Sequence, residues 1–215
     1  QPVLNLQGES LELYEAYLRL DHNGELMSPV AFLAIAEEHG LLADINRWVV
    51  RRAIAILGER QRAGHATHML VKITPESFAD PLLISTLKQE LQAHGVPGDR
   101  LWLHAPESKV FTHLRNAQQF LQAVAPLGCR IGLEQFGSGL DSFQLLAHFQ
   151  PQFLKLDRGF TRDAASTREN FDKIKEITER AQAANIATVA EFVTDANSMT
   201  LLFSAGVDYV QGEFV

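Results

Sequence analysis

RIGLEQFGSGLDSF, residues 130–143, is the stretch that decides the fold class. It begins with a short apolar run ending in Leu133, as expected of a buried β-strand. The polar pair Glu134 and Gln135 follows, and then a loop with two glycines, Gly137 and Gly139. In chains that alternate strands and helices, polar side chains at a strand end usually face a pocket. The stretch therefore predicts a strand, a polar strand end that belongs to a site, and a glycine loop.

The same order of strand, loop and helix repeats along nearly the whole chain. Strands are predicted at 68–73, 100–105, 129–135, 153–157, 186–192 and 208–214, and helices at 29–40, 44–64, 78–95, 114–128, 142–148, 168–185 and 196–206. Residues 1–6 and 11–20 flank a polar turn at 7–10 and predict a hairpin. Serial βα units build a parallel sheet covered by helices, and about eight strands favour a barrel. The predicted fold class is α/β, a TIM-like (β/α)8 barrel with an antiparallel N-terminal strand pair, in a single domain 1–215.

Composition excludes several classes of protein. The formal net charge of −7 argues against binding of DNA through its phosphates. Cys129 is the one cysteine, which excludes a disulfide within the chain and favours the cytoplasm. No apolar run approaches the roughly 20 residues that a membrane helix requires. The chain starts with Gln1 and Pro2 rather than methionine, which predicts a domain excised from a longer multidomain protein.

Polar residues close most of the predicted apolar strands. They are Glu15, Arg19, Lys72, His104, Glu107, Glu134, Gln135, Lys155, Asp157, Glu191, Thr194 and Gln211. Each alone has the simpler role of a solvated strand end. Because the carboxyl ends of parallel strands meet at one end of a barrel, the whole set predicts a pocket lined with polar groups.

Several motifs in a fixed order resemble the EAL domain family of cyclic di-GMP phosphodiesterases. They are YEAYLRL at 14–20, SPVAFLAIAEEHGLLADINRWVV at 28–50, EQFGSGLDSFQLLAHFQPQFLKLDRGF at 134–160 and VAEFVTDANSMTLLFSAGVDYVQGEF at 189–214. The resemblance covers nearly the whole chain. It implies the barrel of that family and, in active members, two divalent cations that activate a water molecule.

The resemblance places the metal ligands of the family at positions that this sequence has largely changed. Glu15, Glu191 and the lysine Lys155 are kept, whereas Lys72 replaces an asparagine, His104 and Thr194 replace glutamates, and Glu134 with Gln135 replaces an Asp-Asp pair. An ammonium group repels a cation, and an amide adds no negative charge. We therefore predict no metal site, no catalytic residue, no required cofactor and no enzymatic activity.

The residues that the resemblance assigns to cyclic di-GMP are better retained. They are Gln1, Tyr17, Leu18, Arg19, Pro29, Phe32, Glu191, Phe192, Gln211 and Gly212. Arg19 stands at a phosphate-binding position, which suits the paired hydrogen bonds of a guanidinium. Phe192 replaces a glycine and offers an aromatic face to guanine. Packing within the protein is the alternative role for Phe32 and Phe192. Lys72 and Lys155, with Arg19, are expected to supply positive charge in place of metal ions.

Within the family, the EQFG and EFVT motifs are most similar to FimX-type regulators of type IV pili and twitching motility. This resemblance implies a bacterial, non-catalytic cyclic di-GMP receptor that signals through protein partners. A PilZ-domain adaptor and a GGDEF domain in the same full-length chain are the expected partners. The expected location is cytoplasmic, at the cell pole if other domains direct it there. Two alternatives stay open: a weak residual metal-dependent phosphodiesterase, and a protein-interaction scaffold that binds no nucleotide.

Overall fold

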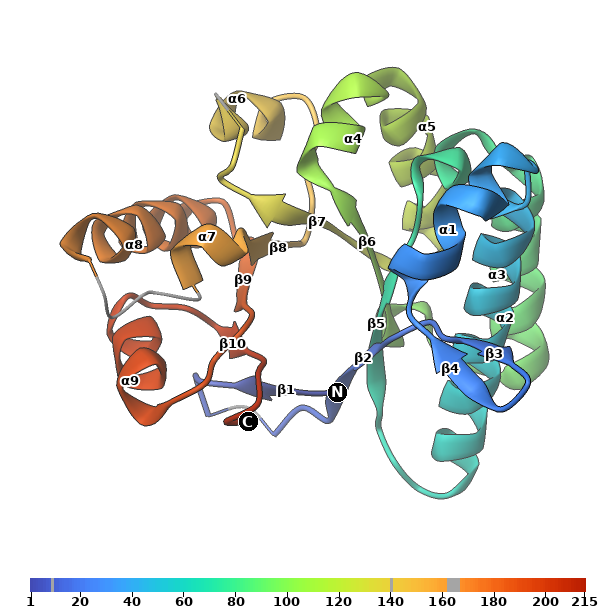
Figure 1. Ribbon diagram of the computed structural model, residues 1–215, viewed down its shortest axis with the longest axis horizontal. Coiled ribbons are helices and arrows are strands. Elements are labelled where there is room, and N and C mark those ends of the chain that lie inside the picture. Colours follow the sequence, from blue (N-terminus) through green and yellow to red (C-terminus); the bar gives the residue numbers. More distant parts are fainter. Residues whose placement is uncertain (9, 140, 162–166) are drawn as a thin grey trace.

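Eight strands close into a barrel in the computed structural model, which describes residues 1–8, 10–139, 141–161 and 167–215 (Figure 1). Around the barrel the order is β1 (Pro2–Asn5), β10 (Tyr209–Val210), β9 (Ala187–Ala190), β8 (Phe153–Leu156), β7 (Arg130–Phe136), β6 (Leu101–Pro106), β5 (His68–Lys72) and β2 (Leu13–Ala16). β1 is antiparallel to β10 and β2, and the other neighbours are parallel. The predicted barrel and its antiparallel first pair are confirmed. Glu9, in the predicted turn between β1 and β2, lies outside the described residues.

Helices surround much of the barrel. They are α1 (Pro29–Glu38), α2 (Leu42–Arg62), α3 (Pro81–His94), α4 (Glu107–Thr112), α5 (Leu114–Val124), α6 (Ser142–Leu146), α7 (Arg158–Thr161), α8 (Arg168–Ala183) and α9 (Ala196–Ser204), with short 3-10 turns η1 (Pro75–Ala79), η2 (Gly98–Arg100) and η3 (Ala125–Leu127). The predicted helices are present, but the start expected at residue 78 lies at Pro81. Asp80 caps α3 there, because its side chain accepts a hydrogen bond from the Leu82 amide. The part of the chain that the structure describes contains no helix long and apolar enough to cross a membrane.

The barrel interior has an apolar layer below a charged layer. Successive side chains of a strand alternate between its two faces, so residues two apart face the same way. The buried interior cluster contains Leu13, Leu70, Trp102, Phe153 and Val189. Each of these residues is followed, two positions further along the chain, by a polar residue. These polar residues lie on the same strands or just past their ends, and they are Glu15, Lys72, His104, Lys155 and Glu191. Strand periodicity therefore brings polar side chains from five strands to the carboxyl end of the barrel.

The predicted first long strand, residues 11–20, is wrong in its extent. β2 ends at Ala16, and the chain then forms a separate hairpin of β3 (Leu20–His22) and β4 (Glu25–Met27). Asn23 and Gly24 connect the two strands with positive φ angles of 55° and 87°. An Asn-Gly pair favours this kind of tight turn, so the hairpin had a signal in the sequence. Arg19 consequently lies beyond the strand rather than at its end.

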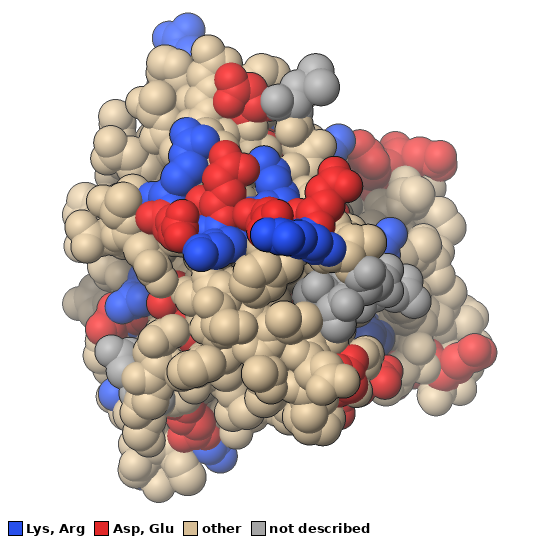
Figure 2. Space-filling model, turned by 90° about the vertical axis from the view of Figure 1, so that its left-hand side faces the viewer, with Lys and Arg blue, Asp and Glu red and all other residues tan. Residues whose placement is uncertain are grey.

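Helix α8 presents a solvated, charged face. Its ion pairs join residues three or four apart, with Lys173–Glu176 at 3.2 Å and Lys175–Glu179 at 3.8 Å. On the face of the molecule that includes α8, acidic and basic side chains lie close together in one band (Figure 2). Because the two signs are interspersed, this face is not a basic patch of the kind that attracts nucleic acid.

Candidate functional site

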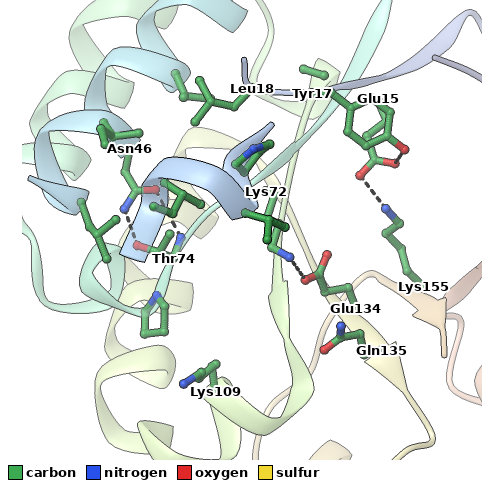
Figure 3. A pocket seen from close by; sticks show the side chains of 18 of the residues that line it. Glu15, Tyr17, Leu18, Asn46, Lys72, Thr74, Lys109, Glu134, Gln135 and Lys155 are labelled. Atoms are coloured by element: carbon green, nitrogen blue, oxygen red, sulfur yellow. Dashed lines mark hydrogen bonds and ion pairs between the residues drawn. The ribbon is translucent and has the colours of Figure 1, made fainter. Parts of the chain in front are cut away.

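A cavity of about 690 Å³ opens at the carboxyl end of the barrel (Figure 3). Its charged floor comes from the strand ends, with Glu15, Lys72, Glu134, Lys155 and Glu191 among the residues that line it. Its apolar wall comes from α1 and α2. The predicted polar-lined pocket is thus present at the expected end of the barrel.

The deepest part of the floor is an ion cluster around Lys155. Lys155 is 1% exposed, and its Nζ lies 2.6 Å from Glu15 Oε1 and 3.0 Å from Glu191 Oε1. Burial alone would lower the pKa of Lys155, but the two carboxylates outweigh burial and raise it. Burial would likewise raise the pKa of Glu15, yet His104 and Lys155 hold it well below its ordinary value. Lys155 and Glu15 are therefore both charged at neutral pH.

His104 joins Glu15 to a second carboxylate, Glu134. Its Nε2 lies 3.2 Å from Glu15 Oε1 and its Nδ1 lies 3.0 Å from Glu134 Oε2, and the residue is fully buried. Nδ1 makes a hydrogen bond with Glu134, whereas Nε2 lies at ion-pair distance from Glu15 without a hydrogen bond. Lys72 Nζ lies 2.5 Å from the other oxygen of Glu134, Oε1. Burial would raise the pKa of Glu134, but His104 and Lys72 lower it to about 2.

Six residues thus form a continuous chain in which basic and acidic side chains alternate, and we call this chain the floor network. Its members are Lys72, Glu134, His104, Glu15, Lys155 and Glu191. Figure 3 shows two contacts of this chain, from Lys72 to Glu134 and from Lys155 to Glu15. Residues from strands far apart in the sequence meet here because the barrel is closed.

The floor network does not fit a pair of divalent cations. The carboxylate oxygens of Glu15 and Glu134 already contact the nitrogens of Lys155, His104 and Lys72. The second oxygen of Glu15 lies 3.2 Å from the Tyr17 hydroxyl, which donates to it. Hard cations require such oxygens to be free and cationic neighbours to be absent. The basic side chains occupy the places where metal ions would neutralise these carboxylates.

Two further positions at which the resemblance expects metal ligands stand apart from the floor network. Gln135 lines the pocket with an exposed side chain and a left-handed backbone, at φ 55°. Thr194 is exposed, and its hydroxyl donates to Asp195 at 3.3 Å. Neither side chain carries negative charge, so neither restores a carboxylate cluster.

Most of the predicted ligand-binding residues line the pocket. They are Tyr17, Leu18, Arg19, Pro29, Glu191 and Phe192. The Arg19 guanidinium donates to the carbonyl of Leu18 at 2.7 Å and lies 5.8 Å from the centre of the Tyr17 ring. Among the described residues it forms no ion pair, so its charge is available to a ligand.

Phe192 combines exposure with an unfavourable backbone conformation. It lines the pocket, is 43% exposed and has φ 63°, in the left-handed region that non-glycine residues rarely adopt. A large exposed aromatic side chain held at such a position is typical of a functional site rather than of packing. The ring is therefore free to stack on a planar ligand.

Gln1, Gln211 and Gly212 are not among the residues that line the pocket. Gln211 is buried, and its amide donates to the Tyr17 hydroxyl at 2.7 Å and to Gln1 Oε1 at 3.0 Å. Gln1 in turn donates to the carbonyl of Gly212 at 3.0 Å. A Cβ on Gly212 would lie 2.1 Å from the carbonyl oxygen of Val193, so glycine is required there by close backbone packing. These residues position Tyr17.

The expected role of Phe32 at the pocket is not reproduced. Phe32 is half-buried and is not one of the lining residues, whereas Val30 and Leu33 of the same helix are. Sequence reasoning also missed the α2 part of the wall, Leu42, Ile45, Asn46 and Val49. Their spacing of three and four residues is the signal of one helix face and could have identified them.

Lys109 and Arg158 were missed as well, and both line the pocket. They belong to α4 and α7, two short helices that the sequence did not predict. Glu107, at the start of α4, is buried and accepts a hydrogen bond from the Gly137 amide at 2.9 Å. This bond connects the predicted glycine loop to the end of β6.

Comparison with known proteins agrees with this geometry. The family model of the EAL domain matches residues 1–215. The EAL domain of FimX from Xanthomonas citri, solved in complex with c-diGMP, is 69% identical, with a TM-score of 0.96 over 100% of this chain and 84% of that one. The FimX EAL domain from Pseudomonas aeruginosa bound to c-di-GMP is 33% identical, with a TM-score of 0.93 over 100% of this chain and 86% of that one.

A curated relative is the cyclic di-GMP phosphodiesterase PdeF of Escherichia coli K12, 28% identical over 216 residues. The match covers 100% of this chain but only 29% of PdeF, so the chain spans less than a third of that relative. The predicted resemblance to EAL domains, and among them to those of FimX, is confirmed. On the match to all of its residues, this chain belongs to the EAL domain family.

Proposed function

We propose that this chain is a cyclic di-GMP receptor that binds the dinucleotide without metal ions and does not hydrolyse it. The observation that carries the proposal is the floor network. Lys72 and His104, which replace two expected metal ligands, lie against the carboxylates of Glu134 and Glu15, which a metal-dependent enzyme would need free. Binding of c-di-GMP by the two FimX EAL domains supports the choice of ligand.

The rest of the pocket has groups suited to a guanine dinucleotide. Phe192 offers a ring for stacking, and α1 and α2 offer an apolar wall. Arg19 offers a guanidinium for a phosphate. Glu37 and Glu76 line the wall at α1 and η1, and carboxylates there can accept hydrogen bonds from the N–H groups of a guanine edge. Gln1, Gln211 and Gly212 act indirectly, by holding Tyr17.

The wider role follows from the FimX-type resemblance. We propose that the chain reports cyclic di-GMP to protein partners in type IV pilus biogenesis and twitching motility. A PilZ-domain adaptor is the proposed partner, and a GGDEF domain is the proposed neighbour in a longer cytoplasmic polypeptide. What supports this part is the 69% identity to the FimX domain of X. citri.

Calorimetric titration with cyclic di-GMP in EDTA, followed by chromatography after overnight incubation with Mg²⁺, tests the central proposal. We expect binding in EDTA and intact ligand afterwards, while PdeF treated in parallel should degrade the ligand. Release of linear pGpG by this chain would contradict the proposal and favour a residual phosphodiesterase. Failure to bind in either buffer would favour a nucleotide-independent scaffold.

A matched pair of variants locates the binding site. Arg19→Ala removes a lining guanidinium that forms no ion pair with the described residues, and it is expected to weaken binding by about tenfold, as for one charge-assisted hydrogen bond. Arg115→Ala removes an exposed arginine of α5 that is not a lining residue, and should leave affinity unchanged. Equal affinity of the two variants would place the ligand elsewhere.

A further inference from the structure

The floor network has no surplus positive charge to offer an anionic ligand. Its three basic residues, Lys72, His104 and Lys155, face three carboxylates. Even with His104 protonated, the six charges sum to zero. Cyclic di-GMP carries two phosphodiester charges, so cations outside the floor network must compensate for them. Lys72 and Lys155, which the sequence suggested for this purpose, are already neutralised.

Three other basic residues line the pocket: Arg19, Lys109 and Arg158. Lys109 lies on α4 and Arg158 begins α7, and both side chains are exposed. Within the described residues, neither forms an ion pair with a carboxylate. Figure 3 shows Lys109 at the pocket with no interaction drawn to it.

The order of the strands places these cations on different sides of the pocket. Arg19 follows β2, Lys109 follows β6 and Arg158 follows β8. In the closed barrel, β8 is separated from β2 by β5, β6 and β7 in one direction and by β9, β10 and β1 in the other. Arg158 is therefore on the opposite side of the barrel rim from Arg19, and Lys109 belongs to the arc between them.

Among the residues that line the pocket, the carboxylates outside the floor network lie on one side, whereas Glu107 and Asp157, at the starts of the segments after β6 and β8, are not lining residues. Glu37 lies on α1 and Glu76 on η1, in the segments that follow β2 and β5. The rim after β6 and β8 carries Lys109 and Arg158 instead. The pocket thus has a cationic side that the sequence motifs did not indicate.

We propose that Lys109 and Arg158 bind the phosphate group that faces away from Arg19. This inference rests on the proposed function, because it concerns the same ligand. The two phosphates of a cyclic dinucleotide lie on opposite sides of its macrocycle. A ligand lying across the pocket would present one of them to Arg19 and the other to the rim after β6 and β8. Both side chains are long and exposed, so they can adjust to the ligand without disturbing the buried floor network.

Calorimetry of Lys109→Ala/Arg158→Ala with cyclic di-GMP in EDTA tests this inference. We expect its affinity to fall by about tenfold or more at low ionic strength, since charge-assisted hydrogen bonds are lost. The loss should shrink as salt is added, because ions screen exposed charges beyond about 10 Å at 0.1 M. The control is Lys88→Ala/Arg115→Ala, which removes two exposed charges of α3 and α5 that are not at the pocket.

The outcomes separate this inference from the function on which it rests. A double variant that binds like the control, at low and at high salt, overturns the inference and leaves the receptor proposal intact. A wild-type chain that does not bind cyclic di-GMP overturns both. Unfolding curves of the two double variants should coincide with that of the wild type, since the residues removed are exposed and unpaired. A weaker affinity then reports lost ligand contacts.

Discussion

Replacement of Glu134 by glutamine measures how much the ionised Glu134 carboxylate contributes to the stability of the folded protein. The carboxyl group has a pKa of about 2 in the folded protein, compared with an ordinary value of 4.5. At about 1.36 kcal/mol per pH unit, this difference corresponds to about 3 kcal/mol of stability at pH 7. Glu134→Gln should lower the free energy of unfolding by that amount, as measured by urea denaturation.

The direction of the pKa shift determines how the stabilisation by Glu134 depends on pH. Because the pKa is lowered in the folded protein, the stabilisation is complete above the unfolded value of 4.5 and is lost as the pH falls toward about 2. The difference between wild type and variant should therefore shrink from about 3 kcal/mol at pH 7 to about 2 kcal/mol near pH 3.5. Glu38→Gln, at an exposed position of α1, is the control. A difference below about 1 kcal/mol at pH 7 would refute the reasoning, because Lys72 and His104 would then not hold the carboxylate ionised.

Two further variants probe the same end of the barrel. Lys155→Met leaves Glu15 and Glu191 close together without the cation between them. The free energy of unfolding, measured by urea denaturation, should fall by about 3–5 kcal/mol. A fall of less than about 1 kcal/mol would contradict the buried ion cluster. Phe192→Gly should raise stability by about 1 kcal/mol, because glycine adopts a positive φ without strain, and should weaken cyclic di-GMP binding about tenfold by loss of stacking. Phe192→Ala should show the same loss of affinity without the gain in stability. Unchanged affinity in both variants would remove the ring from the ligand site.

The fold could be predicted because the sequence repeats one local pattern. Apolar runs such as 129–135 alternate with amphipathic helices, and this order determines a barrel without any knowledge of contacts. Short elements escaped prediction, since α4 and α7 contain too few turns for a helical period to be seen. The β3–β4 hairpin was missed although Asn23 and Gly24 signal a turn, because the apolar run of β2 was extended through it.

The positions of the site residues could be predicted from the sequence, but their partners could not. Glu15 and Lys155 are 140 positions apart, and only closure of the barrel brings them together. Lys72 and His104 stand at positions where the resemblance expects metal ligands. The closed barrel places both of them in contact with Glu134. The helix that carries Phe32 was predicted correctly, but Phe32 is not one of the residues of that helix that line the pocket. A signal for the positive φ of Phe192 was the glycine that the resemblance places at this position.

The alternating charges of the floor network also constrain how the site can evolve. A single change of His104 to glutamate would set a third carboxylate between Glu15 and Glu134, which repel it. A single change of Lys72 to asparagine would remove one of the two cations that neutralise Glu134. Each substitution is tolerable only in the company of others, because coupled buried charges are not additive in their effects. A stepwise change of this network into a cluster of carboxylates alone would therefore pass through less stable intermediates.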